Sequence, residues 1–310
     1  MFVSVVIPTF NRLPILKKCL SALEDQQPSS SIDGYEVLIV DDGSTDGTTE
    51  WLERESTQYP HLKLLKQDHA GPAKGRNKGV ENAKGDIIIF IDSDIVVNYS
   101  FLKAHIRSLE RFWAEKGNRN CFTYGSVINT SDFENPKKEL YKITDISWAY
   151  FATGNVAIDR SLLLKAGLFD TSFFLYGWED LELGERLRKL NVSLVKCPDA
   201  IGYHWHPALT MDKINDLVRV EKERAKMGLV FYKKHPTLRV RFIIQYTFLH
   251  LWLWNLLTLF GLISIENIKP LLAFLIKRGF SSLAMEILRL PLNLISVNSI
   301  YTQAKKSRAI

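Results

Sequence analysis

Polar side chains that can bind ligands follow three short apolar runs in the first third of this 310-residue chain. The runs cover residues 3–7, 35–40 and 87–91, and the polar residues after them include Asn11, Asp42 and Asp94. Near-continuous runs of valine and isoleucine indicate strands buried on both faces, and therefore a parallel sheet. Ligands bind beyond the carboxyl ends of the strands in such sheets. Two carboxylates one residue apart at that edge, Asp92 and Asp94, suit a divalent cation that holds phosphate oxygens.

Each of these clusters also has a simpler interpretation. An isolated Asp-x-Asp is usually a solvated turn, and an isolated Asp-Asp-Gly-Ser is more often a turn followed by a helix N-cap. Three polar clusters at three successive strand ends favour a ligand site, because chance rarely produces that arrangement. We therefore expect Asn11, Asp42 and Asp94 to meet in one crevice.

The first two clusters can seat a nucleotide. Asp42 can accept a hydrogen bond from the N3–H group of uracil, and Phe10 can cover the base, although Phe10 could equally pack in the core. Residues 71–77 open a predicted helix whose free N–H groups, together with Arg76, can face the uridine or its phosphates. In the third cluster, Asp94 is the expected cation ligand, and Asp92 is expected to bind the ribose or a coordinated water.

A second group of candidate residues lies after position 175. Glu179 and Asp180 begin a predicted helix, where carboxylates commonly interact only with the helix dipole. A carboxylate fixed beside aromatic residues is also suited to take a proton from a hydroxyl group, and Trp178 offers a flat face for a sugar ring. His204 and His206 would face the same way on a strand. Either one could add a cation ligand or be an ordinary surface histidine.

Five segments, taken together and in order, resemble family 2 glycosyltransferases, which have the GT-A fold. They are residues 4–12 (SVVIPTFNR), 40–46 (VDDGSTD), 71–77 (GPAKGRN), 92–94 (DSD) and 177–180 (GWED). The resemblance covers residues 1 to about 210 and is specific as a set. It indicates the type of reaction better than the substrate.

The resemblance implies roles for individual residues. The nucleoside would lie against residues of the first two clusters, namely Pro8, Thr9, Phe10, Asn11 and Asp42. Asp180 would be the catalytic base, and Glu179 would bind acceptor hydroxyls beside it. Mn²⁺ or Mg²⁺ would be held by Asp94 and by His204, which matches the family position better than His206 does.

The charge of the chain is unevenly distributed. The net charge is +6, and residues 239–310 contain nine Lys or Arg against two Asp or Glu, so the entire excess lies in this tail. A nearly neutral remainder argues against nucleic-acid binding, whereas a tail that is both basic and apolar points to an anionic membrane surface. The three cysteines are widely spaced and odd in number, which fits a reducing compartment. Residues 1–7 lead straight into a strand without the features of a signal peptide, so we expect a cytoplasmic catalytic domain.

Alternating strands and helices predict an α/β fold of the GT-A, Rossmann-like type with a helical, membrane-associating appendage. The expected domain covers residues 1–235, with a nucleotide-binding half (1–97), an acceptor half (98–210) and a charged helix (211–235). The tail, residues 236–310, contains an uncharged stretch at 242–265 that is long enough to span a bilayer. Its polar residues fall on one arc of a helical wheel, which fits an interfacial or bundle helix better than a lone span. A soluble helical appendage is the alternative.

These observations predict an inverting, metal-dependent glycosyltransferase. We expect it to move a sugar from a nucleotide-sugar, with UDP as the expected nucleotide, to a hydroxyl of a glycan or lipid-linked acceptor. The alternatives are a sugar nucleotidyltransferase and a catalytically silent scaffold that binds a nucleotide-sugar. The expected location is the inner face of the cell membrane, with peripheral or monotopic attachment.

Overall fold

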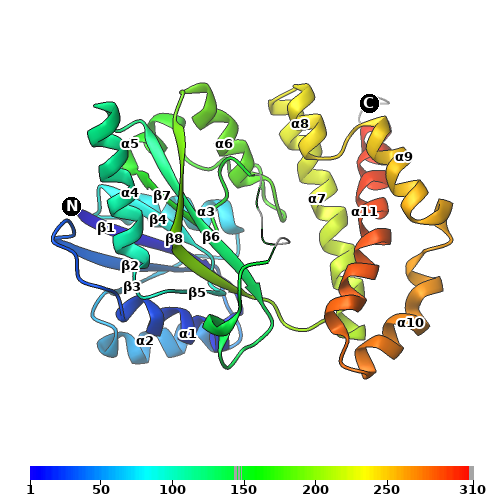
Figure 1. The fold of residues 1–310 in the computed structure, drawn as a ribbon, viewed down its shortest axis with the longest axis horizontal. Helices are drawn as coiled ribbons and strands as arrows, with labels where there is room; N and C mark the ends of the chain where they lie inside the picture. Colours follow the sequence, from blue (N-terminus) through cyan, green and yellow to red (C-terminus); the bar gives the residue numbers. More distant parts are fainter. Residues whose placement is uncertain (143–144, 146, 148, 307–310) are drawn as a thin grey trace. The chain divides into compact units, whose positions relative to one another are not determined.

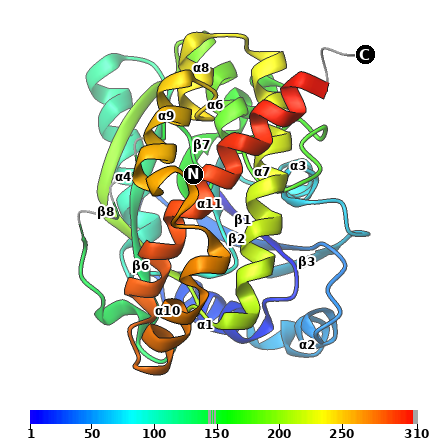
Figure 2. The same cartoon turned by 90° about the vertical axis from the view of Figure 1, so that its right-hand side faces the viewer.

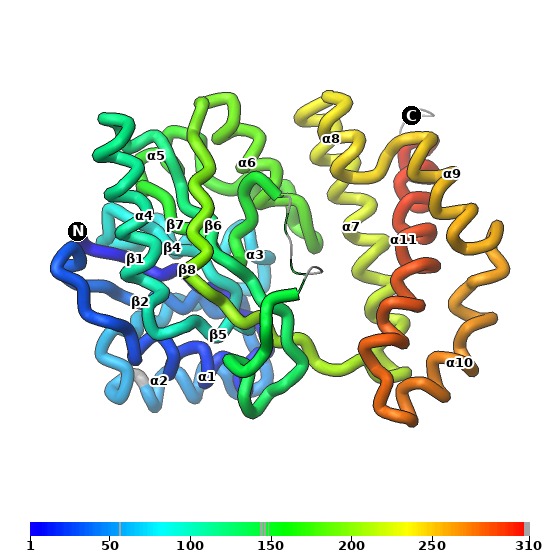
Figure 3. The backbone as a smooth tube through the Cα atoms, in the orientation of Figure 1, coloured from blue at the N-terminus to red at the C-terminus, as the bar shows by residue number. Residues whose placement is uncertain are grey.

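The structure is a computed structural model that describes residues 1–142, 145, 147 and 149–306. The chain divides into two compact units, and Figures 1 and 3 follow it from blue at the N-terminus to red at the C-terminus. The first unit contains Met1–Phe174 and Glu179–His206, and the second contains Leu175–Trp178 and Pro207–Ile310. The boundaries that the sequence predicts at residues 97, 210 and 235 stay predictions.

An eight-stranded sheet forms the centre of the first unit, in the order β3-β2-β1-β4-β7-β6-β8-β5. The strands are β1 (Phe2–Thr9), β2 (Gly34–Asp41), β3 (Leu62–Lys66), β4 (Ile87–Ile91), β5 (Ile95–Val97), β6 (Cys121–Thr130), β7 (Asn155–Asp159) and β8 (Ser193–Trp205). β1 lies parallel to β2 and β4, and β2 lies parallel to β3, as the apolar runs predicted. β7 is antiparallel to β4 and β6, so the sheet becomes mixed beyond β4.

Helices cover both faces of this sheet (Figures 1 and 2). They are α1 (Leu13–Glu24), α2 (Thr48–Glu55), α3 (Pro72–Asn82), α4 (Phe101–Lys116), α5 (Arg160–Ala166) and α6 (Glu179–Lys189). Successive residues of β1 enter two different cores: Val5 packs with residues of α1 and α4, whereas Val6 packs with residues of α3 and α6. Gly79 allows α3 to lie directly on β1, because a Cβ atom there would approach Val6 Cγ1 to 2.3 Å.

The sequence did not predict β5, β8 and α5. β8 lacks a clear alternation of apolar and polar residues, because β5 beside it has only three residues and leaves much of β8 partly exposed. Its register with β6 also shifts, since Gly125 pairs with Cys197 and the next residue pairs with Ile201. Pro198 lies in this irregular stretch, a usual place for proline in a sheet. The strand expected to begin at Phe151 begins instead at Asn155.

The second unit is helical. It contains α7 (Ile214–Lys234), α8 (Leu238–Ile243), α9 (Phe248–Leu257), α10 (Ile265–Lys277) and α11 (Ser281–Lys306), with short 3₁₀ turns η4 (Met211–Lys213) and η5 (Leu259–Gly261). α11 contacts α7, α9 and α10. Its buried residues, which include Leu288 and Leu292, join Leu272 and Leu275 of α10 in a small apolar core.

The expected helix across residues 242–265 is wrong, because the chain breaks it into short pieces. Gln245 and Phe260 have positive φ angles of 59° and 54°, and the Thr247 side chain caps a new helix by accepting a hydrogen bond from the His250 N–H group. The ten residues of α9 extend about 15 Å, half the thickness of a bilayer core. Within residues 1–142, 145, 147 and 149–306, only α11 is long and apolar enough to cross a membrane, and core helices pass that test too. The last four residues of the predicted tail, 307–310, lie outside the described residues.

Candidate functional site

The carboxyl ends of β1, β2 and β4 meet at one edge of the sheet, because these strands are parallel neighbours. The loops after β1 and β2 are joined by hydrogen bonds. The Asn11 N–H group donates to Ser44 Oγ (2.9 Å), and the Thr45 N–H group donates to Asn11 Oδ1 (2.7 Å). Arg12 reaches the third cluster, where its Nη2 lies 4.0 Å from Asp94 Oδ2. The structure therefore brings the three predicted clusters together.

Asp42 has a different set of partners from the one that the sequence suggested. Its Oδ1 accepts hydrogen bonds from the Gln67 side chain (2.6 Å) and the Ala70 N–H group (2.8 Å). Its Oδ2 accepts from the Gly71 N–H group (2.9 Å) and lies 3.0 Å from His69 Nδ1. A carboxylate offers about four acceptor positions. Asp42 thus holds the 67–71 loop, and a bond to uracil would require one of these partners to move.

Phe10 and His69 form an aromatic pair at the same edge. Their ring centroids are 4.3 Å apart, the rings are tilted by 32°, and both side chains are exposed. Exposure removes the alternative that Phe10 is a core residue. Pro8 and Thr9 belong to β1, and Thr9 Oγ1 is buried without a hydrogen-bond partner among the described residues. His69 could not be predicted as a site residue, because a single histidine in a loop has no distinctive spacing.

A buried ion-pair chain connects α3 to the start of α6. The Arg76 guanidinium lies between two carboxylates, with Nη2 at 2.9 Å from Asp92 Oδ1 and Nη1 at 2.8 Å from Glu179 Oε1. The exposed fractions of Arg76 and Glu179 are only 5% and 6%. This arrangement differs from the expectation that Arg76 faces the nucleotide and that Glu179 faces the acceptor. These two ion pairs instead hold the start of α6 beside the Asp92-Ser93-Asp94 cluster.

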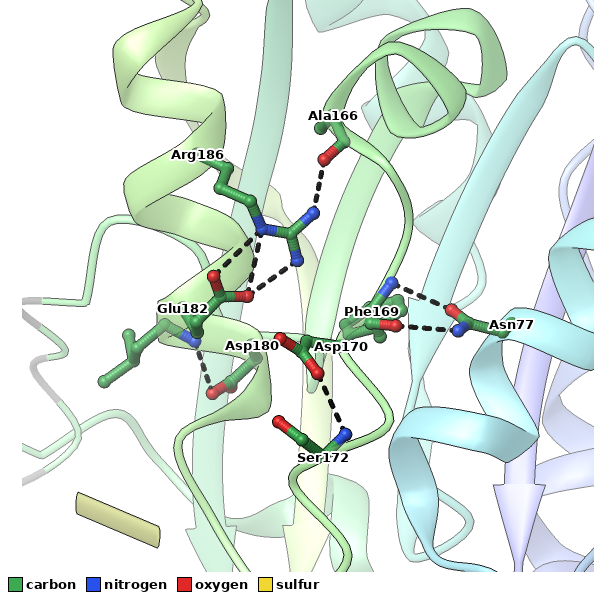
Figure 4. Close-up of polar contacts among 9 residues, drawn as sticks. Asn77, Ala166, Phe169, Asp170, Ser172, Asp180, Glu182 and Arg186 are labelled. Atoms are coloured by element: carbon green, nitrogen blue, oxygen red, sulfur yellow. Dashed lines mark hydrogen bonds and ion pairs between the residues drawn. The ribbon is translucent and has the colours of Figure 1, made fainter. Parts of the chain in front are cut away.

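The next residue of α3, Asn77, fixes the segment that leads toward α6. Its side-chain amide donates to the Phe169 carbonyl and accepts from the Phe169 N–H group, both at 2.8 Å, as Figure 4 shows. Further along α6, Arg186 forks onto Glu182 through its Nε and Nη2 atoms (Figure 4). The adjacent residues Arg76 and Asn77 therefore position α6 from one helical turn. The motif match indicated this turn, but not which partners its side chains would have.

Asp180 lies in the first turn of α6, where its Oδ1 accepts a hydrogen bond from the Leu181 N–H group (2.7 Å; Figure 4). Burial raises the pKa of Asp180 to about 7, and the nearby Glu179 carboxylate adds to the increase, while Arg76 opposes it. A carboxylate with a pKa near neutrality can accept a proton from a hydroxyl group far better than an ordinary aspartate can. The structure thus gives the predicted base a suitable environment.

The raised pKa predicts a pH dependence. If Asp180 is the base, turnover should fall about tenfold per pH unit below pH 7 and level off above it, because only the deprotonated carboxylate accepts a proton. An ordinary aspartate, with a pKa near 3.8, would give a flat profile between pH 5 and 8. The measurement is the pH profile of kcat. A flat profile over that range would show that a group other than Asp180 limits turnover.

Asp94 and His204 meet through a strand pairing that the sequence did not predict. β5 follows Asp94 directly and pairs with the end of β8, so that Ile95 lies opposite His204. Asp94 Oδ1 is 3.1 Å from His204 Nε2. The His206 ring lies near the His204 ring, with a centroid distance of 4.0 Å and a tilt of 49°, so the two histidines lie on the same side of the strand end as predicted.

The Asp94–His204 pair fits a divalent cation. Asp94 Oδ1 is buried and makes no well-aligned hydrogen bond with the described residues. Burial alone would raise the pKa of Asp94, but His204 and Arg12 outweigh it and lower that pKa, so the carboxylate stays ionised. Magnesium sites commonly combine one or two protein ligands with substrate phosphates. Within the part of the chain that the structure describes, no group of three or more His, Cys, Asp or Glu is arranged to hold a metal.

Gly154 and Trp178 have contacts within their own units. A Cβ atom on Gly154 would contact Asp92 Oδ2 at 3.5 Å, so the backbone before β7 lies close to that carboxylate. Trp178 belongs to the second unit, where its Nε1 donates to the Arg224 carbonyl (2.8 Å) and the Arg224 guanidinium lies 5.0 Å from its ring. One face of Trp178 is therefore already in contact with α7, which the sequence did not suggest.

A pocket of about 950 Å³ lies elsewhere in the first unit, along α3 and β3. Three lysines, Lys66, Lys74 and Lys78, line it together with an equal number of carboxylates. The pocket therefore has no excess positive charge for a diphosphate. It also lacks Asp92, Asp94 and Asp180, so it is not the predicted crevice.

Removal of Arg76 should affect both stability and the site. In Arg76→Met, the buried Glu179 carboxylate loses its partner, and we expect the free energy of unfolding to fall by about 3–5 kcal/mol. The matched control is Arg186→Met, which removes the Arg186 partner of the buried Glu182 carboxylate on the same helix. Both variants should be destabilised in urea titrations, but only Arg76→Met should also lose donor affinity or turnover at temperatures where it is folded. Equal losses of activity in both would assign Arg76 a purely structural role.

Comparison with known proteins shows the family of this chain. The family description "Glycosyl transferase family 2" matches residues 4–166. Glycosyltransferase AglE of Haloferax volcanii is 30% identical over 207 residues, which cover 66% of each chain. The uncharacterised glycosyltransferase YfnE of Bacillus subtilis is 25% identical over 266 residues, covering 69% of this chain and 67% of that protein. Chondroitin synthase of Escherichia coli is 28% identical over 245 residues, and the match covers 66% of this chain but only 34% of the synthase.

Solved structures share the fold. The mannosyltransferase PcManGT of Pyrobaculum calidifontis, in complex with GDP-Man and Mn²⁺, matches with a TM-score of 0.60 and 19% identity over 95% of this chain and 86% of that one. GalNAc-T7, with UDP, GalNAc and Mn²⁺, matches with a TM-score of 0.52 and 16% identity over 72% of this chain and 47% of that one. These likenesses confirm the predicted GT-A fold.

Proposed function

Since the chain belongs to glycosyl transferase family 2, we propose that it transfers a sugar from a nucleotide-sugar to a hydroxyl group of a glycan or lipid-linked acceptor. The observation that carries the proposal is the Asp92–Arg76–Glu179 chain of ion pairs. It holds Asp180, with its raised pKa, beside the cluster that contains Asp94. The proposed proton acceptor and the proposed diphosphate site would therefore be close to each other, as a sugar transfer requires.

The proposed reaction is a single displacement. Asp180 takes the proton of the acceptor hydroxyl while the hydroxyl oxygen forms a bond to the anomeric carbon of the donor sugar. The bond between that carbon and the phosphate oxygen breaks, and the nucleoside diphosphate leaves with the electron pair. One displacement inverts the configuration of the anomeric carbon. Asp180 serves as the base. Glu179 contributes indirectly, because its ion pair with Arg76 holds the start of α6, which carries Asp180.

The diphosphate would be held at Asp94 and His204. A divalent cation bound there would neutralise charge on the departing diphosphate. Mn²⁺ or Mg²⁺ is proposed because a carboxylate oxygen and an imidazole nitrogen lie 3.1 Å apart, and because two solved neighbours contain Mn²⁺. Asp92, which is partly exposed, remains available to the ribose through the oxygen that Arg76 does not contact.

The nucleoside would lie over β1 and the following loop. Phe10 and His69 form an exposed aromatic pair that can stack on a base, and Pro8, Thr9 and Asn11 are proposed to contact the nucleoside beside it. UDP is the proposed nucleotide, on the strength of the family resemblance. Because solved neighbours contain either GDP-Man or UDP, and because the Asp42 carboxylate is occupied, base preference needs a direct test.

A location at the cytoplasmic face of a membrane completes the proposal. The nine basic residues against two acidic ones in residues 239–310 support it, as does the likeness to chondroitin synthase, a polysaccharide synthase. Membrane-bound acceptors would then be close to the site. Trp178 is proposed to contact the acceptor sugar through its flat ring.

The test is a screen of UDP-sugars and GDP-sugars with Mn²⁺, with and without a membrane extract as the source of acceptor. Release of nucleoside diphosphate that increases with the extract would support glycosyl transfer. Release of pyrophosphate from a nucleoside triphosphate and a sugar phosphate would instead identify a sugar nucleotidyltransferase. Donor binding without any release would identify a silent scaffold, and either of these results would contradict the proposal.

A further inference from the structure

Helix α9 exposes its apolar side chains and turns its polar side chains inward. The exposed apolar residues of α9 and η5 form one surface, here called the α9 face: Phe248, Leu249, Trp252, Leu253, Leu256, Leu257, Leu259 and Phe260. The α9 members recur at intervals of three and four residues, so they lie on one side of the helix. No residue of α9 itself is buried. An exposed apolar surface of this extent marks an interaction site.

The other side of α9 carries its polar groups, and these are satisfied inside the second unit. Thr258 is fully buried, and its Oγ1 donates to the Trp254 carbonyl (2.7 Å). Trp254 Nε1 donates to the Gln245 side chain (2.5 Å). A surface helix of a water-soluble protein places its apolar stripe inward and its polar residues outward. α9 has the opposite arrangement, which suits a helix whose outer side faces hydrocarbon.

Exposed basic residues follow the α9 face along the chain. α10 exposes Leu271 and Phe274 together with Lys269 and Lys277, and Arg278 directly after α10 is exposed too. The Arg278 guanidinium lies 5.5 Å from the Phe274 ring. Figures 1 and 2 show α9, η5 and α10 following one another on the side of α11 that is away from α7. Apolar side chains with basic residues beside them are complementary to an anionic lipid surface.

The lengths of these helices exclude a simple span by α9 or α10. α9 and α10 have 10 and 13 residues, or about 15 and 20 Å, against about 30 Å of hydrocarbon. α11 is longer, but its residues Leu288, Leu292 and Ile300 are buried, and it contacts α7, α9 and α10. α11 is therefore the central helix of the second unit, and it is not available to lipid on all sides.

We propose that the α9 face enters one leaflet of an anionic bilayer and that the basic residues of α10 lie among the lipid headgroups. The protein is then monotopic, with α9 near the boundary between headgroups and acyl chains. Binding has an apolar part and an electrostatic part, and these respond differently to salt. The proposal names the bilayer contact and does not depend on which sugar is transferred.

The test uses the full chain and vesicles of phosphatidylcholine and phosphatidylglycerol in equal amounts. Leu256→Asp and Phe260→Asp each place a charge in the α9 face, at side chains that are 40% and 72% exposed. The matched control is Leu164→Asp, which changes an equally apolar side chain, 51% exposed, on α5 of the first unit. Co-sedimentation should fall at least about tenfold in the two α9-face variants. The free energy of burying one leucine side chain in an apolar environment exceeds the free energy that corresponds to a tenfold change in affinity. The control should bind like the wild type.

Each result is decisive. Wild-type binding that persists in part at 1 M salt, and that Leu256→Asp abolishes, would support insertion of the α9 face. Wild-type protein that does not bind the vesicles, or α9-face variants that bind as well as Leu164→Asp, would overturn the proposal. A concentration-dependent dimer without lipid that Leu256→Asp dissolves would also overturn it, by identifying a second copy as the partner. Nucleotide binding measured in the same samples reports on the first unit, so a failure of the proposed function would be seen separately.

Discussion

Asp180→Asn should lower kcat by at least about 10²-fold and leave the affinity for the donor nearly unchanged. The substitution keeps the shape of the side chain but removes its capacity to accept a proton, together with its negative charge. Asp180 lies at the start of α6, where burial and Glu179 raise the pKa of its carboxyl to about 7. The measurements are kcat from nucleoside diphosphate release and donor affinity from calorimetry.

The matched control for this prediction is Glu185→Gln. It removes one negative charge from the same helix, at a side chain that pairs with Arg188 instead of approaching Asp92. We expect Glu185→Gln to keep near-wild-type turnover. If Asp180→Asn instead weakened donor binding and left kcat intact, Asp180 would be a binding residue and the base would lie elsewhere. Loss of the step near pH 7 in the Asp180→Asn profile would add independent support.

Residues of the parallel half of the sheet could be predicted well because their pattern has a direct physical cause. β1, β2 and β4 are buried on both faces, so each is a continuous apolar run, and polar residues appear where burial ends. Their shared direction then places Asn11, Asp42 and Asp94 at one edge. Local composition therefore predicted the parallel half of the sheet and the edge at which these three residues meet.

The partners of the site residues could not be predicted, because they depend on contacts between distant segments. Arg76 and Glu179 are 103 residues apart, and only the folded sheet shows that one binds the other. The approach of His204 to Asp94 likewise depends on the pairing of β5 with β8, two strands without a clear sequence pattern. Asp42 is a further case, since its carboxylate is saturated by a loop that lies some 28 residues away along the chain.

The tail shows how a composition can predict a property and still mislead about geometry. The apolar stretch at 242–265 has the length of a membrane span. It is nevertheless broken before and after α9, because Gln245 and Phe260 adopt positive φ angles. Hydropathy counts residues and does not detect such breaks. The polar arc that the helical wheel placed on this stretch nevertheless agrees with Thr258, which follows α9 directly and is buried, whereas Trp252 of α9 is exposed.

Asp94→Ala should abolish metal-dependent donor binding. Asp94 and His204 are the two side chains proposed to hold the cation, and Asp94 Oδ1 lies 3.1 Å from His204 Nε2. Loss of residues that only support metal ligands already costs about 10–100-fold in metal affinity, so loss of a direct ligand should cost at least on the order of 10²-fold. The measurement is the affinity for UDP as Mn²⁺ is titrated, together with Mn²⁺ binding followed by electron paramagnetic resonance, which does not depend on turnover.

Two comparisons keep this last prediction decisive. His204→Ala should also weaken Mn²⁺ binding, because it removes the imidazole while leaving Asp94 in place, whereas Asp33→Ala, at an exposed carboxylate beside the N-terminus, should change nothing. Circular dichroism and urea titrations should show that Asp94→Ala remains folded, since a carboxylate at the sheet edge contributes little to the apolar cores. Full transfer activity of Asp94→Ala, or full wild-type activity in EDTA, would rule out the metal role. The Asp94–His204 pair would then be an ion pair that orders β5 against β8. Charge on the diphosphate would have to be neutralised by cations of the protein itself, and Arg12, 4.0 Å from Asp94, is one candidate.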